Sequence, residues 1–324
     1  MREGGGASPS IGFYKMKEII LITGCCGQIG SNLVKKLKNY DAEIIGLDIS
    51  PPSEELKKIF DDKGKFISCN LLDLNELKKN RNLLEPATKL VHLASVVEDS
   101  NDVLSVAEKT IRLNLFSTIN LLKILPNLKQ ICFSSSMMVY GSTKYSPIDE
   151  SHITNPINLY GLSKKLTEDF LKIYSKEKSL DLSILRFTSI YGPGKYSGNS
   201  AKRAIPNFIR VVIEGKSPNI FGNYKEKRDY LFLDDAIEAI YLTLKKPFSD
   251  TINIGSGESV TILELASTIC KIINPAIKPK IEGEAKSNPL NYLLNISKAK
   301  ELIGFDPNVK IVEGLKLEIK NEIQ

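Results

Sequence analysis

The segment ILITGCCGQIGSNLVKKL, residues 20–37, decides the fold of this chain. It opens with a short apolar run typical of a buried strand and closes with an amphipathic stretch that predicts a helix. Between them Gly24, Gly27 and Gly30 are spaced as Gly-x-x-Gly-x-x-Gly. Glycines at these positions allow a tight turn, close approach of a pyrophosphate and close packing of helix on strand, and the helix N-terminus offers free N–H groups to phosphates. The segment therefore predicts the start of a dinucleotide-binding domain.

A carboxylate ends the next predicted strand. Asp48 closes AEIIGLD, 18 residues after Gly30, where a carboxylate accepts hydrogen bonds from an adenosine ribose. A 2′-phosphate would meet a like charge there, and no Arg follows in LDISPP. We therefore expect NAD rather than NADP. The alternative is that Asp48 is a solvated turn residue in front of two prolines.

The first half of the chain alternates between apolar runs and amphipathic stretches. Short runs without polar alternation suit strands that are buried on both faces. Their alternation with helices predicts an α/β fold with a doubly wound parallel (Rossmann) sheet. The predicted strands lie in EIILITG, AEIIGLD, KFISCN, KLVHLAS, QICFSSS and DLSILRFT. The predicted helices span residues 31–39, 54–60, 74–84, 104–125 and 161–178.

The alternation stops after DLSILRFT, where Gly, Pro, Ser and Asn become frequent. We expect residues 17–185 and 225–255 to form the NAD-binding Rossmann domain. Residues 186–224 and 256–324 are expected to form a smaller, interleaved α/β domain that binds the substrate. Residues 1–15 are rich in Gly and Ser, and we expect them to be a disordered extension.

The composition is that of an ordinary globular protein. Hydrophobic residues make up 42% and charged residues 25% of the 324 residues, so the chain can bury a full core. The net charge of +6 is mild and the lysines are scattered, which argues against nucleic-acid binding. No apolar run approaches the ~20 residues that span a bilayer. The five cysteines show no metal-ligand spacing, so we expect no metal site and a reducing, cytoplasmic location.

The spacing Tyr-x-x-x-Lys would place a phenol and an ammonium on one helical face. It occurs five times, beginning at Tyr140, Tyr160, Tyr174, Tyr191 and Tyr241. The spacing alone therefore does not identify an active site, and the surrounding sequence has to select among these tyrosines.

Ten segments together carry a resemblance to a known family. They are TGCCGQIG (23–30), LD (47–48), HLAS (92–95), NLFSTINLL (114–122), FSSSMMVYG (133–141), YGLSK (160–164), LRFTSIYGPG (185–194), RDYLFLDD (228–235), NIGSGESVTILELA (253–266) and NISKAKELIGFDP (295–307). In this order the chain resembles the extended short-chain dehydrogenase/reductase family, in particular its nucleotide-sugar epimerases and dehydratases.

The order of motifs in that family selects Tyr160. There a strand ends in a Ser- or Thr-bearing stretch before VYG, and a catalytic Tyr follows on a helix. Ser136 lies 24 residues before Tyr160, and Lys164 lies one helical turn after it. The resemblance thus implies Ser136, Tyr160 and Lys164 as catalytic residues.

The other four tyrosines fit this role less well. Tyr140 and Tyr191 precede glycines in turns rather than in helices. Tyr241 has the spacing of a core residue. Tyr174 faces roughly the same side of the helix as Tyr160 but lies ~21 Å further along, at about 1.5 Å per residue, which is too far from the strand ends.

The expected chemistry is proton and hydride removal at one sugar carbon. A phenol has a reference pKa of about 10, and a neighbouring ammonium together with an oxidised nicotinamide lowers it. Tyr160 would then take the proton of a sugar hydroxyl, Ser136 would hold that oxygen, and Lys164 would act on Tyr160 and bind the cofactor ribose. The resemblance implies that hydride returns to the opposite face of a 4-keto sugar, as in 4-epimerisation of UDP-glucose and UDP-galactose.

The resemblance also implies a set of cofactor contacts. Asn70 and Leu71 match an Asp–hydrophobe pair that contacts adenine, and the Asn70 carbonyl can accept from the adenine amino group. Ser134 and Ser135 have the alternative of capping backbone at a strand end. His92 and His152 receive no catalytic or metal-binding role. The implied cofactor residues are Gly24, Gly27, Gln28, Ile29, Gly30, Asp48, Asn70, Leu71, Leu93, Ala94, Ser95, Asn114, Ser134, Tyr160 and Lys164.

Substrate contacts are implied at Ser136, Ser189, Arg203, Arg228 and Lys286. Arg228, in RDYLFLDD, matches an Arg that contacts the nucleotide diphosphate, for which a bidentate donor is suited. Ser189 stands where the family has Asn. Lys286 stands near the place of a missing Arg and supplies charge without a planar fork. The implied substrate is a nucleotide sugar, with UDP as the expected nucleotide.

Met137 and Met138 distinguish between branches of the family. The 4,6-dehydratases carry Asp-Glu or Glu after the position of Ser136, and decarboxylases tend to carry Glu, whereas a thioether exchanges no proton. We therefore expect an NAD-dependent nucleotide-sugar 4-epimerase. The alternatives are a nucleotide-sugar dehydrogenase or reductase that releases NADH, and a catalytically idle NAD-binding protein. The family also implies a homodimer in which the helices at 104–125 and 160–178 pair with their mates.

Overall fold

A parallel sheet forms the centre of the molecule. The computed structural model describes residues 18–97, 102–194, 204–282 and 291–323. In this part of the chain a seven-stranded sheet has the order β11-β6-β5-β4-β1-β2-β3, and its strand pairs are all parallel. Its strands are β1 (Ile19–Thr23), β2 (Glu43–Asp48), β3 (Gly64–Ser68), β4 (Lys89–His92), β5 (Gln130–Ser136), β6 (Asp181–Phe187) and β11 (Asp250–Ile254). The predicted doubly wound α/β fold is confirmed.

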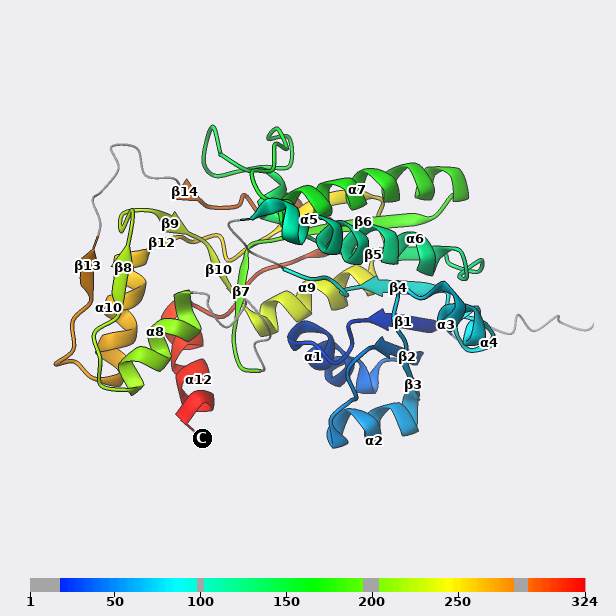
Figure 1. The fold of residues 1–324 in the computed structure, drawn as a ribbon, viewed down its shortest axis with the longest axis horizontal. Coiled ribbons are helices and arrows are strands. Elements are labelled where there is room, and N and C mark those ends of the chain that lie inside the picture. Colours follow the sequence, from blue (N-terminus) through cyan, green and yellow to red (C-terminus); the bar gives the residue numbers. More distant parts are fainter. Residues whose placement is uncertain (1–17, 98–101, 195–203, 283–290, 324) are drawn as a thin grey trace, which may run out of the picture.

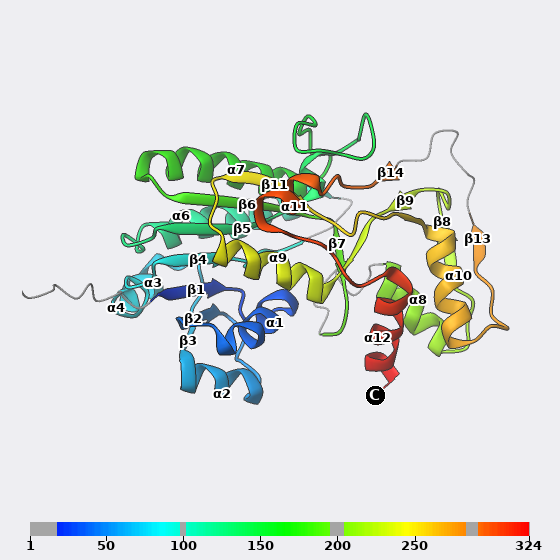
Figure 2. The ribbon, with the colours of Figure 1, turned by 180° about the vertical axis from the view of Figure 1, so that it is seen from behind.

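Helices cover both faces of this sheet (Figures 1 and 2). In β1, Ile20 and Ile22 enter one core and Leu21 enters the other, because successive side chains of a strand point to opposite faces. The first core is closed by α1 (Gln28–Lys36), α2 (Glu54–Lys63), α9 (Leu233–Lys245) and α11 (Ser297–Ile303). The second is closed by α3 (Leu74–Lys79), α4 (Arg81–Leu84), α6 (Ser117–Leu122) and α7 (Leu159–Lys178), and α5 (Val103–Ile111) lies beside α7.

The strand order creates a crevice. β1 lies between β2 and β4, so the connections leave β1 and β4 in opposite directions across the sheet. Loops that diverge in this way leave a crevice at the carboxyl ends of the two strands. The predicted glycine loop follows β1, and Leu93 follows β4, so both predicted cofactor segments meet there.

Two of the predicted helices are interrupted. The helix predicted over 104–125 is divided by a π-helical segment, η2 (Arg112–Phe116), near which the Thr118 hydroxyl donates to the Asn114 carbonyl. The helix predicted over 74–84 is broken at Asn80, whose side-chain amide donates to the Glu76 carbonyl at 3.0 Å. The first predicted helix ends in a 3₁₀ turn, η1 (Leu37–Asn39).

A smaller layer lies beyond the carboxyl ends of the sheet (Figure 1). Its core is formed by α8 (Ala204–Ile213), α10 (Ile262–Ile273) and α12 (Ile311–Ile323). Short strand pairs surround it: β7 (Ser189–Tyr191) with β10 (Tyr230–Phe232), β8 (Asn219–Phe221) with β13 (Lys280–Glu282), and β9 (Lys227–Arg228) with β12 (Val260–Thr261) and β14 (Asn291–Tyr292).

The predicted division into two domains stays a prediction. Helix α11 belongs by sequence to the predicted second domain, yet Ala299 and Ile303 pack into the core of the large sheet. The predicted extension at residues 1–15 lies outside the described residues. Within the described ranges, none of the helices combines the length and the apolar character that crossing a bilayer requires.

Candidate active site

The glycine loop has the geometry of a phosphate-binding turn. Gly24 has a φ of +68°, in the left-handed region that favours glycine. A Cβ on Gly30 would lie 2.1 Å from the Gly24 carbonyl oxygen, so only glycine lets α1 pack this close to the loop. Gly27 is the N-cap of α1 and no side chain caps the helix. The positive end of the helix dipole is therefore open to phosphate oxygens.

Asp48 lies beside this loop at the end of β2. Its carboxylate accepts hydrogen bonds from the backbone N–H groups of Cys26 and Ser50, each at 2.9 Å. A carboxylate has further lone pairs for ribose hydroxyls. The glycine turn, the uncapped helix and this carboxylate together fit a bound dinucleotide.

The loop opens into a cleft of about 720 Å³ between the sheet and the smaller layer. Many of the predicted site residues line it: Gly24, Gly27, Gln28, Ile29, Gly30, Leu93, Ser95, Ser134, Ser136, Tyr160, Ser189 and Arg228. The predicted residues Asp48, Asn70, Leu71, Ala94, Asn114 and Lys164 are not part of its lining as far as the structure describes it. Arg203 and Lys286 lie outside the described residues.

Tyr160 and Lys164 lie one turn apart at the start of α7. The Asn158 side chain caps the helix by accepting from the Gly161 N–H at 2.7 Å, which sets the first turn beside the cleft. Lys164 is buried, its Nζ donates to the Ser134 carbonyl at 2.7 Å, and this Nζ lies 5.7 Å from the centre of the Tyr160 ring. Burial lowers the pKa of Lys164 to about 7, against the opposing effect of Glu168.

The end of β5 points its serines in different directions. Ser136 lines the cleft with Met137 and Met138, and its Oγ accepts from the Met138 N–H at 3.2 Å. Ser135 turns away from it, and its Oγ donates to Glu168 at 2.5 Å. Ser136 and Tyr160 thus line the same cleft.

The other four tyrosines of the spacing lie in different surroundings. Tyr140 is buried, where its hydroxyl donates to Asn253 at 2.6 Å and accepts from Arg186 at 3.1 Å. Tyr174 and Tyr241 pack against the cores of the large sheet. Tyr191 reaches the cleft from β7, but its hydroxyl donates to the Ile311 carbonyl at 3.4 Å. Tyr160 is the one that combines the cleft with an adjacent lysine in the described part of the chain.

Asn114 joins the segment after β4 to α7. Its Oδ1 accepts from the Val96 N–H at 2.8 Å and from the Ser95 hydroxyl at 3.1 Å, and its Nδ2 donates to the Ser163 hydroxyl at 2.8 Å. These bonds hold Ser95 at the cleft and α7 against it. The role that Asn114 fills in the structure is to position this segment, and its predicted contact with the cofactor stays a prediction.

His92, at the end of β4, is bonded to the two elements that flank the segment after β4. Its Nδ1 lies 2.7 Å from the Thr23 hydroxyl and its Nε2 lies 2.8 Å from the Thr118 hydroxyl. Burial lowers the pKa of His92 to about 3, and the charge of Lys164 adds to this effect. The imidazole therefore stays neutral at physiological pH, and its two hydrogen bonds tie β4 to β1 and α6.

The predicted adenine pair is partly engaged elsewhere. The Asn70 Oδ1 accepts from the Leu72 N–H at 3.0 Å, and the Asn70 N–H donates to Glu76 at 2.7 Å. Leu71 is buried in the core. A contact of Asn70 with adenine would share the side-chain oxygen with this local turn.

Arg228 lines the cleft from β9 and forms an ion pair with Glu226. Its Nη2 lies 2.6 Å from Glu226 Oε1, and its guanidinium lies 5.7 Å from the centre of the Tyr292 ring. Glu226 and Ser189 also line the cleft. The pair reduces the net positive charge that a diphosphate would meet at this end.

Two of the five cysteines lie close to a carboxylate in the structure. The thiols of Cys25 and Cys26 and the carboxylate of Asp48 lie within 4.8 Å of one another, an arrangement that a search for separated ligands misses because the two cysteines are adjacent. Cys25 is fully buried, and Asp48 already accepts two backbone hydrogen bonds. We assign no metal to this group.

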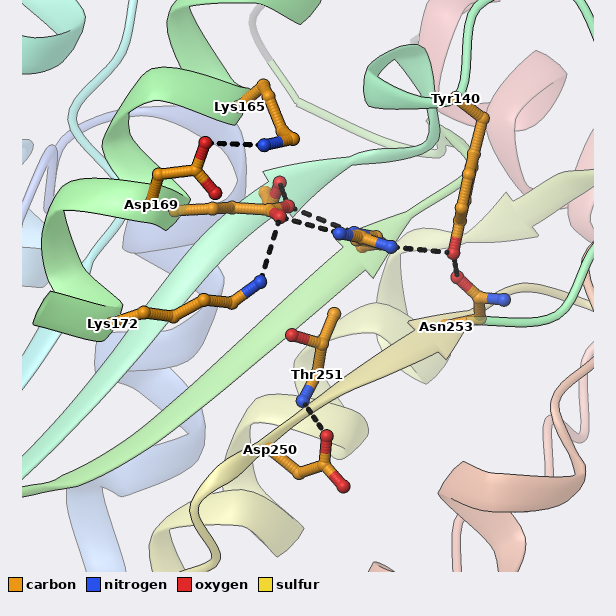
Figure 3. Close-up of polar contacts among 10 residues, drawn as sticks. Tyr140, Lys165, Asp169, Lys172, Asp250, Thr251 and Asn253 are labelled. Carbon is orange, nitrogen blue, oxygen red and sulfur yellow. Dashed lines mark hydrogen bonds and ion pairs between the residues drawn. The ribbon is translucent and has the colours of Figure 1, made fainter. Parts of the chain in front are cut away.

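Sequence reasoning missed a buried network behind the site. Glu168 of α7 and Arg186 of β6 form a paired salt bridge, and Tyr140, Asn253 and Lys172 extend it (Figure 3). The available signals were a glutamate one turn after Lys164 and an arginine inside the apolar run LSILRF. The sequence does not show that Glu168 and Arg186 pair with each other.

The comparisons with known proteins agree with this geometry. The model of the "NAD dependent epimerase/dehydratase family" matches residues 20–255. The chain belongs to this family. The family resemblance seen in the sequence and the predicted cofactor NAD are thereby confirmed.

Relatives within the family differ in activity. A putative UDP-glucose 4-epimerase of Methanocaldococcus jannaschii is 29% identical over 92% of this chain and 96% of its own length. UDP-glucuronic acid decarboxylase 3 of Arabidopsis thaliana is also 29% identical, over 92% of this chain and 87% of its own. The solved structure of the UDP-glucose 4-epimerase of Thermotoga maritima with UDP-glucose is similar to this chain, with a TM-score of 0.81 and 27% sequence identity. The match covers 94% of this chain and 98% of that chain.

Proposed function

We propose that the chain is an NAD-dependent nucleotide-sugar 4-epimerase of the UDP-glucose/UDP-galactose type. The observation that carries the proposal is the shared cleft of the glycine loop, Ser136 and Tyr160, with Lys164 directly behind the phenol. Relatives with UDP-glucose 4-epimerase in their names support the substrate class.

Each residue of this set has a distinct task. Bound NAD would supply the hydride acceptor and later the hydride donor. Tyr160 removes the proton of the sugar hydroxyl and returns it, and the Lys164 ammonium stabilises its phenolate. Ser136 donates a hydrogen bond to the sugar oxygen and holds it beside Tyr160. Lys164 is itself fixed by the Ser134 carbonyl.

The residues next to Ser136 favour epimerisation over elimination or decarboxylation. Met137 and Met138 line the cleft directly after Ser136, where an elimination or decarboxylation enzyme of the family is expected to carry an acidic side chain. A thioether carries no exchangeable proton. Oxidation and reduction at one carbon need no acid besides Tyr160.

Substrate binding is proposed for the opposite side of the cleft. Arg228 and Ser189 would contact the diphosphate, and we retain Arg203 and Lys286 as further proposed contacts. We also propose that Asp48, Asn70 and the glycine loop hold the adenosine half of NAD.

A panel of UDP-, GDP-, dTDP- and CDP-sugars tests the function, with the configuration at C4 followed by NMR. Interconversion of UDP-glucose and UDP-galactose with retention of bound NAD is the expected result. Accumulation of free NADH would instead identify a dehydrogenase, and normal NAD binding without turnover on the whole panel would identify an idle NAD-binding protein.

We further propose a homodimer and a cytoplasmic location. Exposed apolar side chains on α7 form a stripe, because Leu162, Leu166 and Ile173 are spaced to fall on one helical face. Asp169, which pairs with Lys165, lies on the same face and interrupts the stripe. This stripe supports pairing with a second copy. The cysteines, which are all free thiols, support a reducing compartment.

A further inference from the structure

A buried ion pair lies next to Lys164 on the side away from the cleft. The Arg186 Nε donates to Glu168 Oε1 at 3.0 Å, and its Nη2 donates to Oε2 at 2.7 Å. The side chains of Glu168 and Arg186 are 0% and 4% exposed. Desolvation of two such charges largely offsets their attraction, so burial of the pair is weak as a device for stability. Its position suggests a different use.

Glu168 shares the helical face of the proposed catalytic residues. It follows Lys164 by one turn and Tyr160 by two turns on α7. Its Oε1 also accepts from Ser135, and the carbonyl of the preceding residue, Ser134, accepts from Lys164. The same strand end is therefore bonded to both the lysine and the glutamate.

The charged and titratable groups around these two side chains are few. Lys164 faces Glu168 and Tyr160 on its own helix, His92 of β4, and the ring of Phe133 on β5 at 4.9 Å.

Glu168 faces Arg186 of β6, Ser135 of β5 and, at 3.9 Å, Lys172 of its own helix (Figure 3). His92 is neutral, so Glu168 supplies the negative charge that acts on Lys164 within the described residues.

We propose that Glu168 is a positioning residue of the reaction: held by Arg186 and Ser135, its carboxylate keeps Lys164 in the ammonium form and keeps α7 in register with the end of β5. The inference rests on the proposed function, because the ammonium is the group that stabilises the Tyr160 phenolate. Burial lowers the pKa of Lys164 to about 7 even with Glu168 raising it. Without Glu168, Lys164 loses its proton at lower pH and the phenolate loses its partner.

The test compares Glu168→Gln with wild type in the pH dependence of kcat/KM. The alkaline fall in activity, where Lys164 deprotonates, moves to lower pH by about one unit in the variant. Asp169→Asn is the matched control, because it removes the same charge from the next position of α7, where Asp169 is half exposed and pairs with Lys165 rather than with the buried pair (Figure 3). Its profile stays that of wild type. An activity loss in Glu168→Gln that is equal at every pH overturns the proposal.

Two further variants separate electrostatics from folding. Glu168→Asp retains the carboxylate and restores the alkaline limb. Glu168→Gln combined with Arg186→Met removes both members of the buried pair, so Arg186 is not left as an unpaired guanidinium in the core. The alkaline fall in its activity is again shifted to lower pH, because Glu168 and not Arg186 acts on the charge of Lys164. If kcat/KM of the double variant falls at the same alkaline pH as that of the wild type, the proposal is overturned.

The titration of the Lys164 side chain, followed by NMR in the NAD-bound protein, gives a reading that needs no substrate. It shifts to lower pH in Glu168→Gln and in the double variant, and an unchanged titration overturns the inference. If the nucleotide-sugar panel fails, this titration still decides the role of Glu168 on its own.

Discussion

Lys164 is a cation held in the protein interior by a small number of groups. Its side chain is 2% exposed, and its Nζ is bonded to one backbone carbonyl. Burying an ammonium with so few partners costs folding free energy. An apolar residue would pack there at lower cost, which supports the proposed role of Lys164 beside the Tyr160 phenol.

The cost of this burial predicts a pH-dependent effect of Lys164→Met. The pKa of Lys164 is 10.5 when unperturbed and about 7 in the folded protein, so between these values the unfolded chain binds more protons than the native one. The stability of the wild type therefore rises with pH across this window, and the variant lacks that rise. Relative to wild type, the variant should be most stable at pH 7 and below and should lose this advantage toward pH 10. Urea unfolding across this range measures the difference, and a difference independent of pH would contradict the pKa.

Tyr160→Phe separates binding from chemistry. The variant keeps the ring that packs beside Lys164 and loses the hydroxyl that we propose exchanges the proton. We expect turnover to fall by about 10²–10⁴-fold, with the bound NAD content unchanged. Tyr174→Phe is the control, because Tyr174 lies further along α7 and packs against the core. Full activity in Tyr160→Phe would show that a different group is the base.

At the scale of elements, β1 and α1 act as one unit with the loop between them. The closest approach is at Gly30, where a Cβ would lie 2.1 Å from the Gly24 carbonyl and 2.7 Å from the Cys25 Cα. Gln28 adds a link to the smaller layer by donating to the Gly192 carbonyl at 2.6 Å. The position of α1 therefore sets both the phosphate turn and one wall of the cleft.

Gly30→Ala should displace α1 and open this turn. We expect a loss of about 1–3 kcal/mol in the free energy of unfolding, as for overpacking elsewhere, together with weakened NAD binding. Urea unfolding and NAD titration measure the two effects. Ser31→Ala is the control in the same helical turn, since the Ser31 hydroxyl donates to the Gln28 carbonyl of its own helix at 3.3 Å. Equal NAD affinity in Gly30→Ala and wild type would show that the close packing is not required.

The sequence predicted those elements whose signal is contained in one segment. The strands were predictable because both faces of each are buried, which gives an unbroken apolar run. The break of the helix over 104–125 was not predictable, because it lies where Asn114 bonds to residues from two other segments. The pairing of Glu168 with Arg186 was not predictable for the same reason, since the two residues come from α7 and β6. The oxygen of Asn70 was assigned to adenine from a motif, while a local turn also uses it.

At the scale of the whole molecule, the cleft depends on the smaller layer staying over the sheet. Asp229 is one connection: its carboxylate is fully buried and accepts from the Ser256 N–H at 2.8 Å and the Ser256 hydroxyl at 2.7 Å. The neighbouring Arg228 faces the cleft. Ser256 follows β11, the last strand of the large sheet. Its bonds to Asp229 therefore fix the position of Arg228, the proposed diphosphate contact, relative to that sheet.

The exposed stripe on α7 predicts the assembly. Leu162, Leu166 and Ile173 are 38%, 37% and 71% exposed, and on a helix their directions agree within about 40°. An apolar stripe on a surface helix lowers its free energy when a second helix covers it, and two copies related by a two-fold axis would cover each other. We therefore expect a dimer in sedimentation, and a monomer with unchanged circular dichroism for Leu166→Glu combined with Ile173→Glu. Val312→Glu, at a 46% exposed position of α12, should remain dimeric; a monomeric wild type would show that the stripe is covered by something other than a second copy.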